Sequence, residues 1–297
     1  MKSKSMLNTY DLDNFYVIVL SQPFKLLLEV YIKMKCKICN SQTENFSRAK
    51  LANEFVVDYF RCPNCGLIQT EEPYWLEKVY TSAIADSDIG LIQRNIVLSQ
   101  VTKAIISTLF DSNGRFLDYG GGYGIFVRLM RDSGYDFYRF DKYCPNLFAK
   151  GFDVEVETKN HYELLTAFEL FEHLPNPLED IQEMLSYSDS ILFSTELVPT
   201  DTPGPGEWWY YALESGQHIS FYTEKSLSVI ARKFDRKCYS NGKSLHMITN
   251  KKISPNIFPI VASYRMARLI NIFNRRESLL ESDYNKIIEE GMDKELT

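Results

Sequence analysis

The fold of this 297-residue chain is decided by one stretch, Arg115-Phe116-Leu117-Asp118-Tyr119-Gly120-Gly121-Gly122-Tyr123-Gly124-Ile125-Phe126. An apolar run that ends in Asp118 meets four glycines, and apolar residues at helical spacing follow as far as Met130. Glycine permits a sharp turn and lets a ligand approach the backbone without a Cβ in the way. This order predicts a strand, a tight turn and a helix N-terminus, the place where open α/β sheets bind nucleotide-like ligands.

The spacing of the glycines indicates which ligand the turn accepts. The G-x-G-x-x-G pattern of dinucleotide folds is absent, because Phe126 and Val127 stand where a third glycine is needed. No Gly-Lys-Ser/Thr follows, so the loop of P-loop proteins is absent too. Residues 138–141 predict a second strand ending in Asp141, at the spacing of a carboxylate that binds a ribose diol. A ligand with a ribose and an ammonium group but no phosphate is S-adenosylmethionine.

From about Phe116 to about Thr249 the chain resembles the class I S-adenosylmethionine-dependent methyltransferases. Three further stretches support this resemblance. Residues 162–177 are similar to the family's fourth strand and the Glu-His-x-x-x-Pro turn after it, and residues 190–197 are similar to its fifth strand. Residues 216–222 are similar to a segment that precedes a late helix. The last segment resembles one branch, which joins a cysteine-rich zinc-binding segment to the methyltransferase domain. The resemblance implies an α/β fold with a Rossmann-like, seven-stranded methyltransferase sheet, and several members of the branch act on sugars or other small hydroxylated metabolites.

The resemblance also implies which residues bind the donor. They are Asp118, Gly120, Gly122, Gly124, Asp141, Phe168 and Glu169. The backbone of the three glycines would lie against the methionine and ribose, with the first aspartate below the amino group and the second on both ribose hydroxyls. Phe168 and Glu169 would face the methionine end. Three of these residues also have a purely structural interpretation: capping for Asp118, an ordinary strand-end turn for Asp141, and core packing for Phe168.

Four of the six cysteines form two C-x-x-C pairs, namely Cys36, Cys39, Cys62 and Cys65. This grouping fits metal ligation in a reducing compartment better than a secreted disulfide framework. Four thiolates close a tetrahedral zinc site and leave no open position, so we expect a structural zinc ion. Zinc would contribute roughly 10–16 kcal/mol to a segment too short to bury its own core. A redox pair and a nucleic-acid-binding ribbon are the alternatives, disfavoured by the missing thioredoxin-like unit and by the net charge of −6.

The pattern along the chain predicts four parts. They are an N-terminal extension (1–33), a zinc-ribbon-like module (34–73), a class I methyltransferase domain (74–250) and a C-terminal helical segment (251–297). The extension is interpreted either as a strand-and-helix segment or as a translation-start artefact, since Met34 directly precedes the first cysteine pair. A hydrophobic content of 45% and a charged content of 24% are ordinary for a soluble globular protein. No stretch has the length of a membrane span or the form of a signal peptide, so a cytoplasmic location is expected, without membrane or nucleic-acid partners and with a homo-oligomer as one option.

Within these parts the periodicity predicts individual elements. A strand near 55–61 enters the second cysteine pair, and a long helix within 75–110 leads into the body. Strands are expected near 115–119, 137–141, 152–156, 163–168 and 190–196, and helices near 124–133, 145–150, 178–186 and 224–234. Asn241-Gly242 predicts a final antiparallel hairpin of 236–240 and 244–250. Two or three helices are expected after Ser254.

A hydroxyl acceptor is too weakly acidic to attack unaided, so a nearby general base matters. Of the four histidines, His161 is interpreted as a surface residue and His246 as a structural residue inside the last strand. His218 is the favoured base and His173, in the turn after the fourth strand, is the second candidate.

His218 follows the aromatic run Trp208-Trp209-Tyr210-Tyr211, which comes after a flexible Pro-Gly segment and suits stacking on a sugar or another ring. Tyr211, Glu214 and Tyr222 are the neighbours expected to orient the base or to bind the acceptor.

The favoured function is therefore methylation of a small hydroxylated metabolite, with a sugar or nucleotide-sugar among the candidates. O-methylation is favoured over C- or N-methylation. Two other classes stay open: a zinc-ribbon binding protein with a non-catalytic Rossmann-like scaffold, and a nicotinamide oxidoreductase, which the missing third glycine disfavours.

Overall fold

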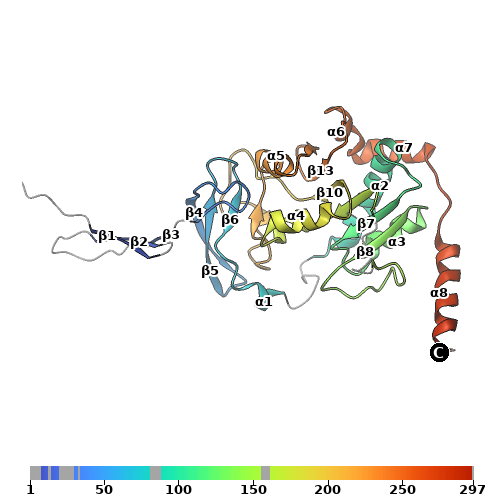
Figure 1. The fold of residues 1–297 in the computed structure, drawn as a ribbon, viewed down its shortest axis with the longest axis horizontal. Helices are drawn as coiled ribbons and strands as arrows, with labels where there is room; N and C mark the ends of the chain where they lie inside the picture. The colour runs from blue at the N-terminus through green and yellow to red at the C-terminus, as the bar shows by residue number, and fades with distance from the viewer. Residues whose placement is uncertain are drawn as a thin grey trace, which may run out of the picture.

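The computed structural model describes residues 8–12, 15–19, 30–32, 34–80, 88–154 and 161–295, with side chains between 34 and 289. The predicted α/β architecture is confirmed: a sheet of six strands in the order β12-β13-β10-β9-β7-β8 is covered by helices on both faces (Figure 1). No helix in the described part of the chain is long and apolar enough to cross a membrane.

The sheet is parallel at its centre and antiparallel at one edge. Its strands are β7 (Arg115–Tyr119), β8 (Asp136–Phe140), β9 (Leu164–Ala167), β10 (Ser190–Ser194), β12 (Lys237–Ser240) and β13 (Leu245–Thr249). β9 and β10 are buried along their whole length, as expected of parallel strands covered on both faces. The predicted hairpin is confirmed, because β12 and β13 pair antiparallel. In its turn Gly242 has a φ of +78°, and the Asn241 side chain accepts hydrogen bonds from the N–H groups of residues 243–245.

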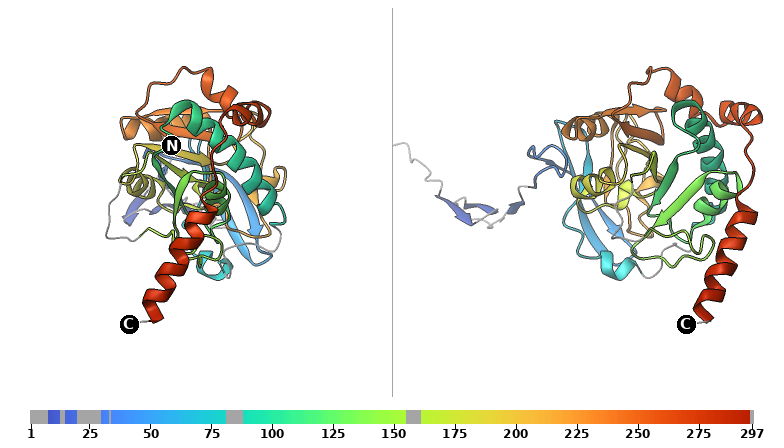
Figure 2. Two further views of the ribbon diagram at one scale, coloured as in Figure 1. Left: turned by 90° about the vertical axis from the view of Figure 1, so that its right-hand side faces the viewer. Right: turned by 45° about the vertical axis from the view of Figure 1, so that its right-hand side comes forward.

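Two apolar cores lie on the two faces of the sheet. One face is covered by α2 (Leu91–Leu109), α3 (Ile125–Asp132), α6 (Ile257–Val261) and α7 (Tyr264–Phe273), and the other by α4 (Pro177–Leu185) and α5 (Glu224–Lys233). The last helix, α8 (Leu280–Glu295), runs away from the body (Figure 2) and is tied to it where Asp283 accepts hydrogen bonds from Arg128 and Arg131. Three helices therefore follow Ser254, within the predicted range.

Two predicted elements of the body differ from the structure. The prediction of a helix at 145–150 is wrong, because the Asn146 side chain accepts a hydrogen bond from the Ala149 N–H and donates one to the Ala149 carbonyl, which closes a local turn. The strand predicted near 152–156 is reduced to a single parallel bridge between Arg139 and Asp153, and its end lies outside the described residues. The described sheet consequently has six strands instead of the seven that the resemblance implied.

The N-terminal part contains two further sheets. β1 (Asn8–Leu12), β2 (Phe15–Val19) and β3 (Val30–Ile32) pair antiparallel, and the rest of the predicted extension lies outside the described residues. The cysteine-bearing module contains β4 (Glu44–Leu51), β5 (Phe55–Arg61) and β6 (Ile68–Thr70), followed by the short helix α1 (Leu76–Val79). Its sheet is completed by β11 (Ser220–Phe221), which comes from far downstream and pairs with β6.

Candidate functional site

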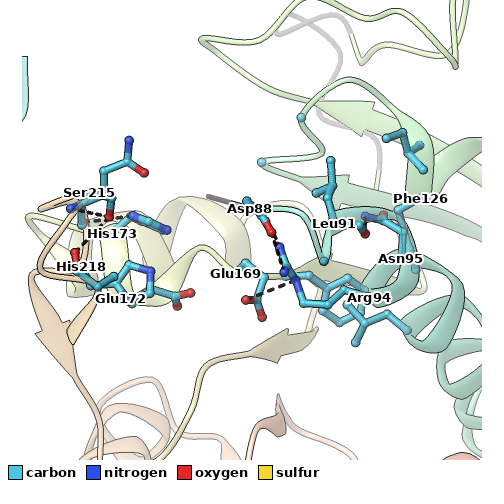
Figure 3. Close-up of a pocket in the computed structure, with 18 of the residues that line it drawn as sticks. Asp88, Leu91, Arg94, Asn95, Phe126, Glu169, Glu172, His173, Ser215 and His218 are labelled. Atoms are coloured by element: carbon cyan, nitrogen blue, oxygen red, sulfur yellow. Dashed lines mark hydrogen bonds and ion pairs between the residues drawn. The ribbon is translucent and has the colours of Figure 1, made fainter. Parts of the chain in front are cut away.

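A cavity of about 440 Å³ opens beside the carboxyl ends of β7 and β9. Its walls come from residues 88–98 at the start of α2, 118–126 in the glycine loop, 168–173 after β9 and 209–218 before β11. Figure 3 shows Glu172, His173 and His218 together at one end, while Arg94 and Phe126 lie toward the other. The cavity thus brings the predicted donor loop and the two favoured histidines into one space.

The glycine loop is held by the end of the neighbouring strand. The N–H groups of Gly120 and Gly121 donate to the Phe140 carbonyl at 2.8 and 3.2 Å. Gly120, Gly122 and Gly124 have φ values of +72°, +53° and +88°, which side chains with a Cβ rarely adopt. The first two line the cavity, whereas Gly124 lies at the start of α3 outside the lining.

Asp118 lies at the end of β7 and lines the cavity, with only 3% of its surface exposed. The Thr166 hydroxyl donates to one of its carboxylate oxygens at 2.6 Å. Burial raises the pKa of Asp118 to about 7, against the lowering effect of the Thr166 hydrogen bond. The structure therefore places this carboxyl beneath the glycine loop, where the resemblance expects the donor's amino group.

Asp141 follows β8 but is not part of the cavity lining. One of its oxygens accepts a hydrogen bond from the Gly122 N–H at 2.9 Å, and the other accepts from the N–H groups of Tyr143 and Cys144 at 2.9 and 2.8 Å. The carboxylate thereby braces the glycine loop. Since an ionised carboxylate has about four acceptor positions, one remains for a ligand.

Phe168 and Glu169 both line the cavity. Glu169 adopts a φ of +51°, and its N–H donates to the Ser194 hydroxyl at 2.8 Å while that hydroxyl donates to its carboxylate at 2.6 Å. The guanidinium of Arg94 stands 3.6 Å from the other Glu169 oxygen and is held by two hydrogen bonds to Asp88 of 2.8 and 2.7 Å. A helix was predicted for the segment that contains Arg94, but Arg94 itself was not predicted to belong to the site. Nothing in the local sequence pattern indicates that the Arg94 side chain faces the glycine loop.

His173 and His218 lie edge to face with ring centroids 4.8 Å apart. The Nδ1 of His218 is 2.7 Å from the Tyr210 carbonyl, and that of His173 is 3.1 Å from the Gln217 carbonyl. A carbonyl oxygen accepts only from an N–H, so these contacts assign the proton to Nδ1 and leave both Nε2 atoms as acceptors. The Tyr80 hydroxyl oxygen, 2.8 Å from the Nδ1 of His173, then accepts from the same N–H. Burial lowers the pKa of His173 to about 3 and that of His218 to about 4, so both rings are neutral at pH 7.

Glu172 is a cavity residue for which no role was predicted from the sequence. It lies in the 3₁₀ turn Phe171–His173, is 0% exposed, and has no hydrogen bond of ordinary geometry to either carboxylate oxygen from the described residues. Burial, and then the charge of Glu169, raises the pKa of Glu172 to about 8. The signal in the sequence was present, since Glu172 stands in the quoted turn directly before His173.

The aromatic run before His218 is divided between the cavity and the core. Trp209 and Tyr210 line the cavity, and Trp209 is 73% exposed. Tyr211, predicted to act beside the base, lies outside the lining: it is fully buried and its hydroxyl donates to the Pro203 carbonyl at 3.0 Å. Glu214 does line the cavity. The 3₁₀ turn Trp209–Tyr211 explains the division, because it turns successive rings to different sides.

The two other histidines lie away from the cavity. His161 is exposed, as predicted. His246 is buried in β13, where its two ring nitrogens contact the Ser240 hydroxyl at 2.8 Å and the Thr195 carbonyl at 3.0 Å, as expected of a structural residue.

The four predicted cysteine ligands come together, with their sulfur atoms within 4.8 Å of one another. The Sγ atoms of Cys36 and Cys65 are 3.5 Å apart, and those of Cys39 and Cys62 are 3.4 Å apart. The N–H of Cys65 points at the Cys62 sulfur at 3.4 Å, as in a metal-binding knuckle. Four converging sulfur atoms suit a structural zinc ion.

This cysteine module is joined to the segment that carries His218. β11 follows His218 by one residue, and the N–H of Thr70 donates to the Ile219 carbonyl at 3.0 Å. The Ile219 N–H donates in turn to the Glu172 carbonyl at 2.9 Å, and the Trp75 indole donates to the Gly216 carbonyl at 2.8 Å. The module therefore helps to position one end of the cavity.

Residues 93–240 match a family model described as "Methyltransferase domain". No protein with a curated description matches the chain significantly.

Several solved structures share part of the fold. The plantazolicin methyltransferase BpumL, solved with S-adenosylhomocysteine, is 13% identical with a TM-score of 0.39, over 58% of this chain and 94% of that one. The methyltransferase CalO1 of calicheamicin biosynthesis is 14% identical with a TM-score of 0.38, over 52% of this chain and 54% of that one. Magnesium protoporphyrin IX methyltransferase from Synechocystis PCC 6803 is 11% identical with a TM-score of 0.37, over 60% of this chain and 97% of that one.

Proposed function

We propose that this chain, which belongs to the methyltransferase-domain family and uses S-adenosylmethionine, transfers the methyl group to a hydroxyl group of a small metabolite. The observation that carries the proposal is the shared cavity, in which a glycine loop lies near two neutral histidines with free Nε2 atoms. Methyl transfer from a sulfonium needs mainly the positioning of donor and acceptor, and a base where the acceptor holds its proton tightly.

The donor would lie along the glycine loop. Gly120 and Gly122 would supply the backbone surface, Gly124 leaves room for the turn at Asn146 and Ala149 against the start of α3, and Asp118 would accept the amino group from below. Asp141 would receive the ribose through its remaining acceptor position. Phe168 and Glu169 would lie at the methionine end of the donor, with Arg94 beside them in a position that suits the donor's carboxylate.

The acceptor would lie against the histidines. The Nε2 of His218 is the favoured proton acceptor, with His173 second, because both rings are neutral and fixed by backbone carbonyls. Glu214 lies in the same wall and would bind an acceptor hydroxyl. Tyr211 would act only through packing, since its hydroxyl is occupied outside the cavity.

A sugar is the acceptor class that the walls favour. The exposed indole of Trp209 gives a flat apolar surface for the face of a sugar ring, and carboxylates nearby accept hydrogen bonds from hydroxyl groups. A carbon or nitrogen acceptor would use the same donor cradle, and the carbon-13 chemical shift of the transferred methyl group distinguishes the three products.

The four-part division of the chain is kept as part of the proposal, with the zinc-ribbon-like module at 34–73, the methyltransferase domain at 74–250, and the flanking segments 1–33 and 251–297. Zinc at Cys36, Cys39, Cys62 and Cys65 would be structural. One strand crosses this division, since β11 completes the sheet of the module.

Calorimetric titration of the purified full chain with S-adenosylmethionine, S-adenosylhomocysteine and NAD tests the proposal. We expect saturable binding of the first two and none of NAD. Failure to bind either sulfur nucleoside would favour a zinc-ribbon binding protein with a non-catalytic scaffold, and binding of NAD alone would favour an oxidoreductase.

A further inference from the structure

We propose that Glu172, His173 and His218 form a second metal site, separate from the cysteine cluster, which binds a divalent first-row cation such as Zn²⁺ at the acceptor end of the cavity. The inference rests on the proposed function and refines it. With the ion bound, His218 would act on the acceptor oxygen through the metal and not as a free base.

The three side chains already converge. One ligand atom from each of them lies within 4.8 Å of the other two. Bonds of about 2.0–2.1 Å in a tetrahedral zinc site place ligand atoms about 3.3 Å apart, so the widest pair would close by up to about 1.5 Å. Rotation of a glutamate side chain covers that distance, and Figure 3 shows the Glu172 side chain beside both rings.

The two histidines are prepared as ligands. Each presents its Nδ1 to a backbone carbonyl, of Tyr210 for His218 and of Gln217 for His173, and neither Nε2 lone pair has a hydrogen-bond partner in the described part of the chain. The Tyr80 hydroxyl also contacts the Nδ1 of His173 at 2.8 Å. Metal-bound histidines usually donate their other ring N–H to a carbonyl, carboxylate or water, which fixes the tautomer and the ring orientation.

Glu172 is the independent observation that points to a bound cation. Its carboxyl group is completely buried, lines the cavity, and has no hydrogen-bond partner among the described residues. The hydroxyls of Tyr210 and Thr195 lie close enough to this carboxyl group to lower its pKa slightly, but neither makes a hydrogen bond of ordinary geometry to it, and they contact each other at 3.2 Å. A buried carboxyl group without a partner costs free energy, and a metal ion supplies the missing partner.

The charged side chains around Glu172, His173 and His218 do not provide a cationic partner for the Glu172 carboxyl group, so an added cation would provide it. Arg94 carries the one guanidinium among the cavity-lining residues described; its two terminal nitrogens donate to Asp88, and its Nε stands 3.6 Å from Glu169, so it makes no hydrogen bond to Glu172. Glu169, Glu172 and Glu214 all line the cavity, so the described wall is rich in carboxylates. A cation between the two rings would offset part of this negative charge.

Two imidazoles and one carboxylate leave a coordination position open, unlike the four thiolates of the cysteine cluster. The open position would face the cavity, where an acceptor oxygen can enter. A metal ion lowers the pKa of a hydroxyl group bound to it, so the acceptor would lose its proton to solvent in the open cavity. Its oxygen would then form a bond to the donor's methyl group, and the sulfonium would leave as the neutral thioether. The metal would therefore favour acceptors that offer a hydroxyl group.

Titration of the full chain with Co²⁺ tests the site. Weakly held metal is first removed with a chelator, and the cysteine cluster is verified to retain one zinc equivalent. We expect one equivalent of Co²⁺ to bind saturably, with the absorption of cobalt on nitrogen and oxygen ligands and without the intense thiolate charge-transfer band. Glu172→Gln and His218→Asn should abolish this binding, and His161→Asn, an exposed histidine far from the cluster, should leave it unchanged.

The wild-type titration alone decides whether the site exists, so a poorly folded variant cannot hide a negative result. Absence of saturable Co²⁺ binding, binding through thiolates only, or binding that survives both substitutions would overturn the inference. Donor titrations on the same samples keep the two proposals apart, because a chain that binds S-adenosylhomocysteine but no Co²⁺ retains the proposed function with His218 as a free base.

Discussion

Asp118 and Glu172 are both buried carboxyl groups of the cavity, yet their surroundings differ. Asp118 receives a hydrogen bond from Thr166, whereas Glu172 has no partner among the described residues. The hydrogen bond from the Thr166 hydroxyl offsets part of the free-energy cost of burying Asp118, so this carboxyl group is tolerated before a charged ligand binds. At the methyl-donor end of the cavity the protein itself supplies the hydrogen-bond partner of the buried carboxyl group. At the acceptor end, the partner of Glu172 is supplied by the ion or molecule that binds there.

Substitution of His218 tests the acceptor end at the scale of one residue. His218→Ala should leave the affinity for S-adenosylmethionine nearly unchanged and lower turnover by about 10²–10⁴, because the group that acts on the acceptor is lost while the glycine loop is untouched. Donor calorimetry and single-turnover kinetics measure the two effects. The exposed His161→Ala is the control, and a His218→Ala variant with normal turnover would remove His218 from the mechanism.

Asp118 makes the stability of the ligand-free protein depend on pH. Its pKa is about 7 in the folded state and 3.8 when unperturbed, so the native state binds the proton more tightly than the unfolded state. Stability contributed by this group therefore falls as the pH rises from about 4 to about 7, by up to about 4 kcal/mol. Thr166, Asp141 and Arg139 are the groups that act on it.

Asp118→Asn should remove this pH dependence. Urea unfolding at pH 5 and pH 8 should show the variant gaining stability relative to the wild type as the pH increases. An unchanged difference between the two pH values would mean that Asp118 is ionised throughout this range.

At the scale of elements, the sequence predicted the strands and helices with clear periodicity well. β7, β9 and β10 each contain a short run of adjacent apolar residues, namely Phe116-Leu117, Leu164-Leu165 and Ile191-Leu192-Phe193, and the turn residues between the strands are distinctive. The prediction failed at 145–150, where the bonds of the Asn146 side chain to the backbone compete with helix formation. Arg94 could not be identified, because the rotation of α2 relative to the glycine loop is set by packing far from it in sequence.

The pairing of β6 with β11 leads to a prediction about zinc. Removal of the metal should disorder the knuckles first, and through β11 it should displace His218 while the glycine loop stays in place. Cys39→Ser, which removes one ligand of the cysteine cluster alone, should therefore lower turnover much more than donor affinity, and should lower the melting temperature because zinc binding contributes folding free energy.

Cys238→Ser is the matched control, since Cys238 lies in β12 outside the cysteine cluster. The same measurements, turnover and donor calorimetry, apply to both variants. Equal loss of donor binding and turnover in Cys39→Ser would show that the module supports the whole domain and not the acceptor end in particular.

At the scale of the whole molecule, the linear division into parts does not describe the contacts. The sheet of the cysteine module needs β11 from the methyltransferase domain, and α7 packs against α2 from the other end of the chain. A sequence shows neighbours along the chain and its periodic faces, but it does not show which distant strand completes a sheet. For the same reason Glu172, His173 and His218 were visible as residues but not as one cluster.

The central claim is that the cavity between the glycine loop and the histidine pair holds the methyl donor. A crystal structure of the full chain with S-adenosylhomocysteine tests it most directly. The account predicts the nucleoside along Gly120–Gly122, with its amino group at Asp118 and its sulfur directed toward His218. A cavity filled by protein side chains, or a nucleoside bound elsewhere on the molecule, would contradict it.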